Sequence, residues 1–435
     1  MGRYFGTDGI RGIANQDLTA DLAYKCGNAL TVLKKFPTVV IGRDTRLSGD
    51  MLALSVSSGI TAGGGNVLDV GIMPTAAIAY LTKYFGASYG VVISASHNPP
   101  EYNGIKVFGS DGYKLLEEDE AAIESCFTKS NYIAHPNLGK YKKIEYGSDI
   151  YVDYLRKTCP EGLNGLKVVL DCCNGAAYQV APQVFKELGA DVRVYNSENT
   201  GLRINVGCGS LHPEDLVKKV VEKGCDIGFA FDGDSDRLLA VDEKGNQING
   251  DHIIYLVATN LKKEGKLKGN IAVGTHHTNM GIQKALEDKD IKLLRADIGD
   301  KYVMELMLKN GAVIGGEQSG HVIMSEFATT GDGILSAIQV ARLLMSGKKL
   351  SECLDVKLYP QVNINVAVKD KIRVMNNEDL AEFINDCRAK LASKGRVLVR
   401  ASGTEPRIRV MVECEDLDIA KDLADQIVDK VNKIG

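Results

Sequence analysis

Short apolar runs recur along the chain, and three of them begin the same pattern of elements. In each copy, a first strand is followed by a helical stretch, a second strand and then a third strand. The first strands are expected at residues 38–41, 167–170 and 271–273, and the second strands at 66–70, 191–195 and 291–295. This alternation predicts three related α/β units whose mixed or parallel sheets are covered by helices.

The third strand of each copy runs into a polar loop that contains glycine or proline. These loops lie at residues 94–99, 232–237 and 316–321. Open α/β folds gather their functional groups beyond the carboxyl ends of strands. Because the three loops leave equivalent strands, we expect them to converge on one cleft.

The C-terminal segment breaks this pattern and predicts a smaller α+β domain. Strands are expected at residues 361–368, 396–400 and 408–413, the last two as a hairpin-like pair, and helices at 377–384 and 417–431. The expected fold is therefore α/β with four domains. Three related α/β units with mixed sheets would occupy residues 1–145, 146–248 and 249–356, and the α+β domain residues 357–435.

The composition is that of an ordinary globular protein, with 44% apolar and 25% charged residues in a chain of 435. A formal net charge of −4 provides no basic field, which argues against nucleic acid as a partner. No apolar run reaches the roughly 18 residues of a membrane-spanning helix, and the N-terminal stretch lacks the apolar core of a secretory signal. The ten cysteines show no C-x-x-C spacing, so we expect reduced thiols in a cytoplasmic protein.

Ser96 is the candidate nucleophile or phosphoryl carrier. It follows an apolar run at residues 89–93 and precedes His97, Asn98 and two prolines, which cannot continue a sheet or a helix. A hydroxyl at the end of a strand, beside an imidazole, stands where open α/β folds place reactive groups. The alternative is that Ser96 or Asn98 merely caps a turn.

Asp232, Asp234 and Asp236 form a candidate site for a hard metal ion. Three carboxylates at this spacing repel one another unless a cation neutralises them. An EF-hand calcium loop fails, because Arg237 stands where that loop needs glycine for its sharp turn. Few carboxylates and room for a phosphate favour Mg²⁺ over Ca²⁺, and Arg237 would be close enough to bind the same anion. The alternative is a solvated acidic turn.

Three further stretches carry groups suited to a sugar phosphate. The loop at 316–321 offers a carboxylate, an amide, a hydroxyl and an imidazole for sugar hydroxyls, although a polar turn has the same composition. The loop at 400–409 combines hydroxyls, glycine and arginines, as phosphate-binding turns do, with a solvated basic turn as the alternative. Arg11 lies in a glycine-rich stretch whose backbone could approach a ligand; taken alone, this stretch is equally a glycine-rich turn with a surface arginine.

These five loops, in this order, resemble those of the α-D-phosphohexomutases, and the resemblance runs from Phe5 to Val412. Within that superfamily the chain is most similar to the bacterial phosphoglucosamine mutases. The resemblance implies four domains around a central cleft, which agrees with the threefold repeat. It also implies an isomerase that uses a phosphoserine, Mg²⁺ and a hexose 1,6-bisphosphate activator. A small sugar phosphate would be its partner, and the resemblance is compatible with a homodimer.

The resemblance further implies a role for individual residues. Ser96 would carry the phosphoryl group, and an oxygen of that group would join Asp232, Asp234 and Asp236 in holding Mg²⁺. Lys106 and Arg11 would act near the transferring group, Lys106 by handling a proton. The groups expected to hold the substrate are Glu317 and Ser319 on the sugar hydroxyls with His321 assisting, Arg237 on the transferring phosphate, and Arg400, Ser402, Gly403, Thr404 and Arg409 on the other phosphate.

The identity of the sugar depends on finer features. Gln318 and residues 329–334 and 405–413 resemble the glucosamine branch. Residues 99–104 look more like the glucose and mannose mutases, and Ser235 stands where the glucosamine enzymes usually carry glycine. We therefore expect interconversion of glucosamine 6-phosphate and glucosamine 1-phosphate, with a phosphoglucomutase or phosphomannomutase as the alternative. A silent sugar-phosphate-binding regulator would not need the carrier serine.

Overall fold

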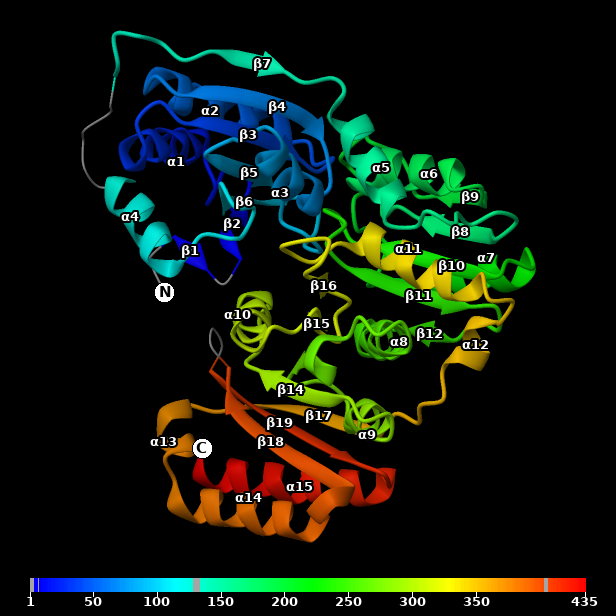
Figure 1. Ribbon diagram of the computed structural model, residues 1–435. Coiled ribbons are helices and arrows are strands. Elements are labelled where there is room, and N and C mark those ends of the chain that lie inside the picture. Colours follow the sequence, from blue (N-terminus) through cyan, green and yellow to red (C-terminus); the bar gives the residue numbers. More distant parts are fainter. Residues whose placement is uncertain (1–3, 7, 128–133, 403–405) are drawn as a thin grey trace. The chain divides into compact units, whose positions relative to one another are not determined.

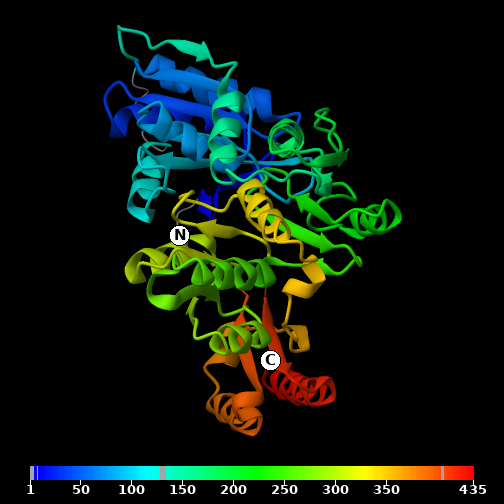
Figure 2. The ribbon, with the colours of Figure 1, turned by 45° about the vertical axis from the view of Figure 1, so that its right-hand side comes forward.

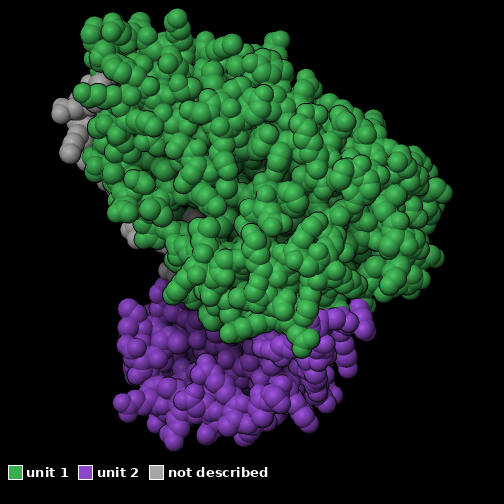
Figure 3. Space-filling model, in the orientation of Figure 1, with its two compact units in different colours: residues 1–277, 290–354 green, residues 278–289, 355–435 purple. Residues whose placement is uncertain are grey.

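The computed structural model describes residues 4–6, 8–127, 134–402 and 406–435 and divides into two compact units (Figure 3). The first unit comprises residues 1–277 and 290–354, and the second comprises 278–289 and 355–435. The first unit contains three sheets with helices, and the second contains a smaller antiparallel sheet with helices. The predicted fold class, three related α/β units and a smaller α+β domain, is thereby confirmed.

The three sheets of the first unit share one strand order (Figures 1 and 2). Their first strands are β3 (Thr38–Arg43), β8 (Lys167–Asp171) and β13 (Ile271–Thr275), and their second strands are β4 (Asn66–Ile72), β9 (Asp191–Tyr195) and β14 (Lys292–Ala296). Their third strands are β5 (Tyr89–Ile93), β10 (Ile227–Phe231) and β15 (Ile314–Gly316), and their fourth strands are β6 (Tyr102–Gly109), β11 (Leu238–Asp242) and β16 (Val322–Met324). In each sheet the order is fourth, third, first, second, and only the fourth strand is antiparallel to its neighbour among these four. The predicted threefold repeat is confirmed.

Short strands extend two of these sheets. The additions are β1 (Phe5–Gly6) and β2 (Gly9–Ile13) beyond β6, β7 (Tyr141–Lys143) beyond β4, and β12 (Gln247–Ile248) beyond β11. The glycine-rich stretch near the N-terminus is therefore not a turn alone. Its residues from Gly9 to Ile13 pair antiparallel with β6, and this pairing brings Arg11 opposite Gly104.

Helices cover the sheets of the first unit. They are α1 (Ala20–Leu33), α2 (Gly49–Ala62), α3 (Thr75–Tyr84), α4 (Glu117–Phe127), α5 (Gly147–Lys157), α6 (Ala177–Glu187), α7 (Glu214–Glu222), α8 (Gly250–Lys263), α10 (Asp300–Asn310), α11 (Gly333–Leu344) and α12 (Leu350–Cys353), with the 3₁₀ helix η1 (Lys268–Asn270). In the first sheet, alternate apolar residues of the strands meet the apolar faces of α1 and α2 in one core that includes Val39, Ile41, Leu30 and Val56. Burial of these residues fixes the strands whose ends carry the polar loops.

The second unit has its own core. Its sheet has the antiparallel order β17 (Gln361–Ala367), β19 (Arg407–Cys414), β18 (Gly395–Ala401), and its helices are α9 (Met280–Glu287), α13 (Lys371–Met375), α14 (Glu378–Leu391), η2 (Ala392–Lys394) and α15 (Leu417–Ile434). The expected hairpin-like pair and both expected helices are present, with α14 capped by the side chain of Asn377. Apolar residues from the sheet and from α14 and α15 pack into one buried cluster.

The cysteines and the helices bear on the sequence-based expectations on disulfides and membrane spans. All ten cysteines are free thiols. The neighbouring Cys172 and Cys173 are both buried, as a packing role requires. Across the described ranges, no helix combines the length and apolar character needed to cross a membrane.

Candidate active site

Ser96 lies in the loop between β5 and β6 and is 1% exposed. Its φ of 51° falls in the left-handed region, which residues with a side chain seldom adopt. Its hydroxyl donates a hydrogen bond to Asp232 Oδ2 at 2.6 Å, and His97 Nδ1 lies 3.3 Å from Ser96 Oγ. Burial, helped by Arg237, lowers the pKa of His97 to about 4, so this imidazole is neutral near pH 7. The loop between β5 and β6 (residues 94–101, the serine loop) and the loop between β10 and β11 (residues 232–237, the aspartate loop) therefore meet.

Asp232, Asp234 and Asp236 come together in the loop between β10 and β11, and all three are buried. One ligand oxygen from each lies within 4.8 Å of the others. Burial, together with Asp236 and Asp234, raises the pKa of Asp232 well above its ordinary value. Oδ1 of Asp234 and Oδ1 of Asp236 are buried and accept no hydrogen bond from any described residue. A divalent cation fits this donor set, because it would neutralise the shared charge and occupy the unpartnered oxygens.

Lys106 supplies a buried positive charge beneath these carboxylates. It lies on β6, is 2% exposed, and its Nζ is 2.9 Å from Asp234 Oδ2 and 3.5 Å from Asp236 Oδ2. Asp8 Oδ2 lies 3.0 Å from the same nitrogen. Burial alone would lower the pKa of Lys106, but the three carboxylates hold it well above its ordinary value. The ammonium is therefore charged, and it balances part of the buried negative charge.

Two arginines flank the serine loop. Arg11 Nη1 donates to Asn98 Oδ1 at 3.4 Å, and the same guanidinium pairs with Asp8. The backbone amide of Arg237 donates to Asp232 Oδ1 at 3.1 Å, and the Nε atom of Arg237 lies 3.9 Å from Asp236 Oδ1. The Nε atoms of both arginines are buried and make no hydrogen bond to a described residue. Unpartnered donors and acceptors therefore lie on residues linked to the Ser96 loop, and a phosphoryl group and a cation are the combination that would satisfy them.

The loop between β15 and β16 carries Glu317, Ser319 and His321. His321 is buried with Nδ1 3.6 Å from Asp236 Oδ2, and its Nε2 accepts a hydrogen bond from the Gly331 amide at 3.0 Å. Glu317 is half-buried and its Oε1 accepts from the Gly299 amide at 3.0 Å, whereas Ser319 is exposed. His321 thus contacts a carboxylate of the aspartate loop, whereas Glu317, Gln318 and Ser319 are partly or fully exposed to solvent.

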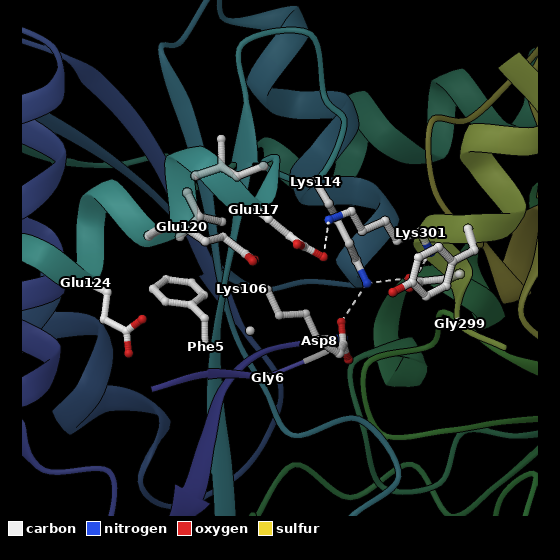
Figure 4. Close-up of a pocket in the computed structure, with 16 residues that line it drawn as sticks. Phe5, Gly6, Asp8, Lys106, Lys114, Glu117, Glu120, Glu124, Gly299 and Lys301 are labelled. Atoms are coloured by element: carbon white, nitrogen blue, oxygen red, sulfur yellow. Dashed lines mark hydrogen bonds and ion pairs between the residues drawn. The ribbon is translucent and has the colours of Figure 1, made fainter. Parts of the chain in front are cut away.

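A cavity of about 310 Å³ opens beside Lys106 (Figure 4). It is lined by β1, β2, α4 and the start of α10. At its inner end, Lys114 Nζ donates to Asp8 Oδ1 at 2.6 Å and also pairs with Asp300 at the first turn of α10. Lys301 pairs with Glu117 at 3.0 Å. The volume is near the lower end of the range for small-molecule sites.

The phosphate-binding candidates of the C-terminal domain lie in the second unit. Arg400 on β18 is the direct cross-strand neighbour of Arg409 on β19, and Ser402 is buried. Burial and the neighbouring Arg409 lower the pKa of Arg400. Gly403 and Thr404 lie outside the described residues. Two guanidinium groups, which suit phosphate binding, therefore stand side by side on neighbouring strands.

Several residues of the site were not singled out by the sequence. Asp8 and Asp300 complete the charge network of Lys106 and Lys114, and Asp44 and Arg46 lie behind the serine loop. A charged Gly-Arg-Asp sequence directly after a first strand, at residues 42–44, was the available signal. Its direction in space depends on how β3 packs beside β5, which the apolar pattern alone does not specify.

Comparisons with known proteins agree with this geometry. Residues 2–133, 149–245, 249–359 and 364–430 match, in order, the models of phosphoglucomutase/phosphomannomutase domains I, II, III and the C-terminal domain. A phosphoglucosamine mutase from Thermoanaerobacter sp. (strain X514) is 48% identical over 99% of this chain and 100% of its own. A phosphoglucosamine mutase from Shouchella clausii is 46% identical over 100% of this chain and 99% of its own.

The fold is also found among solved structures. A phosphoglucomutase/phosphomannomutase family protein from Burkholderia thailandensis superposes with a TM-score of 0.83 at 23% identity, covering 100% of this chain and 98% of that one. At that identity the likeness concerns the fold alone. Together with the family models, it covers all three sheets of the first unit and the sheet of the second.

Proposed function

The chain belongs to the phosphoglucomutase/phosphomannomutase family, and from this premise we propose that it is a phosphohexomutase acting on glucosamine phosphates. It would interconvert glucosamine 6-phosphate and glucosamine 1-phosphate through a phosphorylated Ser96. The sugar is chosen because full-length relatives near 48% identity are named phosphoglucosamine mutases. The observation that carries the chemistry is the contact of the Ser96 hydroxyl with Asp232, in a loop that also holds buried, unpartnered aspartate oxygens and an unpartnered arginine Nε.

Phosphorylated Ser96 would donate its group to a free hydroxyl of the bound hexose monophosphate. The bond from phosphorus to Ser96 Oγ breaks and a bond from phosphorus to the sugar oxygen forms. In the net step the proton of the sugar hydroxyl replaces phosphorus on Ser96 Oγ. The resulting 1,6-bisphosphate turns end for end and returns its other phosphate to Ser96, which restores the phosphoenzyme. A trace of hexose 1,6-bisphosphate would act as activator by phosphorylating any enzyme that has lost the group.

The charged groups around Ser96 fit this transfer. Asp232, Asp234 and Asp236, with an oxygen of the phosphoserine, would hold Mg²⁺, which when bound supplies charge neutralisation for phosphoryl transfer. Arg11 and Arg237 would donate to the phosphoryl oxygens with their unpartnered Nε atoms. Lys106 is charged where it lies, so it would stabilise the departing oxygen and supply its proton.

The remaining groups would hold the sugar and its second phosphate. Glu317 and Ser319 would bind sugar hydroxyls with His321 assisting, and the phosphate that is not transferred would be held by Arg400, Ser402, Gly403, Thr404 and Arg409. This last site must accept either end of the sugar, so we expect the C-terminal domain to move during turnover. The domain boundaries near residues 145, 248 and 356 stay predictions, and limited proteolysis would test them.

We expect the protein to act in the cytoplasm, because ten free cysteines, most of them buried, suit a reducing compartment. Light scattering coupled to size-exclusion chromatography would test whether it forms a homodimer. Neither property affects the chemistry proposed above.

A coupled assay with glucosamine 6-phosphate, Mg²⁺ and a trace of glucose 1,6-bisphosphate tests the proposed function. We expect kcat/KM for the glucosamine phosphate to exceed the values for glucose and mannose phosphates by at least about tenfold. Faster turnover of glucose or mannose phosphates would overturn the choice of sugar and leave the chemistry intact. Ser96→Ala should abolish turnover while retaining ligand binding, and persistent turnover in that variant would overturn the phosphoserine mechanism.

A further inference from the structure

The side chain of Arg46 is fully buried behind the serine loop and donates five hydrogen bonds. Its Nη2 donates to the carbonyl oxygens of Ser96 at 2.9 Å and Asn98 at 2.8 Å. Its Nη1 donates to the carbonyl oxygens of Tyr102, at 2.9 Å, and Pro99. Its Nε donates the fifth bond, to Asp44 Oδ2. Since a guanidinium has five N–H donors, every donor of this side chain is used, and four of them grip the backbone of one loop.

Asp44 holds this arginine and reaches the same loop from the other side. Its Oδ2 accepts from Arg46 Nε at 2.9 Å and from the Ser94 hydroxyl at 2.5 Å, and its Oδ1 accepts from the Arg46 amide. The Ser94 oxygen in turn accepts from the Ser96 amide at 2.9 Å. Both backbone polar groups of Ser96 are therefore tied to the Asp44–Arg46 pair, the carbonyl directly and the amide through Ser94.

A second grip comes from another repeat. Asn205 Nδ2 donates to the carbonyl oxygens of Ser96 at 2.8 Å and Asn98 at 2.9 Å, which are two of the oxygens that Arg46 also binds. Next to it, Gly233 of the aspartate loop leaves no room for a side chain, because a Cβ there would meet the Ser96 carbonyl oxygen at 2.5 Å. The serine loop is thus fixed against the aspartate loop as well as within its own sheet.

We propose that Asp44, Arg46 and Asn205 are positioning residues that hold the backbone of Ser96 in its left-handed conformation through each transfer cycle. This inference rests on the proposed function of Ser96 as phosphoryl carrier. None of the three side chains hydrogen-bonds the Ser96 hydroxyl, so they act through the backbone. They keep Oγ beside Asp232 whether or not the serine carries a phosphoryl group.

Two properties of Ser96 explain why its backbone has to be held: the changing charge on its side chain and its left-handed conformation. A phosphoryl group adds nearly two negative charges beside three buried carboxylates, and each transfer removes and restores them. A left-handed serine costs of order 1 kcal/mol and persists only when its surroundings determine it. Because a displacement of about 1 Å at a reacting atom can reduce the rate roughly 100-fold, the backbone has to stay fixed while the charge changes.

Arg46→Lys is the decisive variant, because lysine keeps the positive charge but lacks the planar guanidinium with its five donors. Three donors on one nitrogen cannot reach four carbonyl oxygens and Asp44 together. Arg43→Lys is the matched control, since Arg43 is the last residue of β3, three positions before Arg46, and its guanidinium pairs with Asp50 and Asp69, which lie outside the serine loop. Both variants, and the wild type, are assayed with glucosamine 6-phosphate, Mg²⁺ and glucose 1,6-bisphosphate.

We expect Arg46→Lys to lower kcat by about 100-fold while KM changes by less than about threefold, because the groups proposed to bind substrate are elsewhere. Arg43→Lys should keep kcat within about twofold. Hydrogen exchange of the amides at residues 96–98, 101 and 102 should rise at least about tenfold in Arg46→Lys and stay unchanged in Arg43→Lys. A kcat within twofold of wild type, or unchanged exchange in that loop, would overturn the proposal.

Asn205→Ala provides an independent arm if Arg46→Lys does not fold. It removes the two bonds from Asn205 Nδ2 to the serine loop, together with the bond that Cys173 Sγ donates to Asn205 Oδ1, and leaves the Arg46 contacts in place. We expect kcat to fall about tenfold, again with KM retained; an unchanged kcat would count against the role of Asn205. Failure of the proposed function is distinguishable, because the wild type itself would then show no turnover and no phosphorylation of Ser96 by glucose 1,6-bisphosphate in intact-mass measurements. The exchange measurement does not depend on turnover.

Discussion

Thr75 and Asp234, 159 positions apart in the sequence, are joined by two hydrogen bonds. The Thr75 hydroxyl donates to Asp234 Oδ2 at 2.6 Å, and its amide donates to the Asp234 carbonyl at 3.0 Å. Thr75 is the first residue of α3, so a helix of the first repeat begins on the aspartate loop of the second. The aspartate loop is therefore held by a neighbouring repeat as well as by its own strands.

Thr75→Val should weaken this connection while preserving shape. The variant removes the donor to a buried carboxylate and keeps the backbone bond, so we expect a loss of about 1–3 kcal/mol in the free energy of unfolding. Thr82→Val on the same helix is the control, because the hydroxyl of Thr82 is also buried but donates only to the Ile78 carbonyl of its own helix. Urea denaturation of both variants measures the difference. Equal losses would show that Asp234 gains nothing specific from Thr75.

Asp232→Asn should separate stability from cation binding. Because burial and its neighbours raise the pKa of Asp232 well above its ordinary value, an uncharged amide costs little in the metal-free protein, and the melting temperature should stay equal or rise. The rise in melting temperature that Mg²⁺ gives the wild type should shrink strongly in the variant, and kcat should fall by about 100-fold or more. Calorimetric scans with and without Mg²⁺ test this. A variant that responds to Mg²⁺ as the wild type does would remove Asp232 from the metal site.

Lys114→Met should destabilise the first unit. Lys114 Nζ lies between Asp8 and Asp300, and its removal leaves two carboxylates without their shared cation. We expect a loss of about 2 kcal/mol in the free energy of unfolding, less than for a fully buried pair because Asp8 is partly exposed. Lys301→Met is the matched control, since its partner Glu117 is exposed, and it should unfold at the same urea concentration as the wild type. Identical midpoints for the two variants would contradict the bridging role.

His252 predicts how stability depends on pH. It lies in the first turn of α8, and burial lowers its pKa to about 4 from 6.5. Between these values the unfolded chain binds a proton that the folded chain does not. The contribution of the neutral His252 ring to the free energy of unfolding is therefore fully present above pH 6.5. It is lost as the pH falls towards 4, by at most about 3 kcal/mol.

His252→Gln is the appropriate comparison for that measurement. Glutamine does not titrate and can still accept from the Asn249 amide, as the capping box at the start of α8 requires. Denaturation midpoints measured from pH 7 to pH 4.5 should fall more steeply for the wild type than for the variant. Parallel curves would mean that the His252 ring becomes charged without cost in the folded protein.

The sequence predicted the repeating part of the fold because its strands are short apolar runs that end in polar loops. Strands β3, β5 and β8 begin at the predicted residues, since burial on both faces leaves little ambiguity about where such a strand starts. The stretch that forms β2 was harder to assign. Its glycines favour a turn, and only pairing with β6 makes it a strand.

The candidate site was predictable where its residues share one loop, and not where distant segments meet. Three aspartates in five residues indicate a cation by themselves. Arg46, by contrast, looks in the sequence like any charged residue of a loop. Its five hydrogen bonds depend on the packing of β3 beside β5. Asn205 is a similar case, because its contact with Ser96 joins two repeats. Local pattern carries no information about such meetings.

The shared strand order of the three sheets has a consequence for how this chain could have diversified. In every repeat the polar loop joins the third strand to an antiparallel fourth strand, so its two ends are held together by the ladder beneath it. An insertion or deletion in such a loop leaves the register of the strands unchanged. Each copy could therefore acquire its own functional groups, such as a serine hydroxyl, three carboxylates or an imidazole, without altering the strands of the other two.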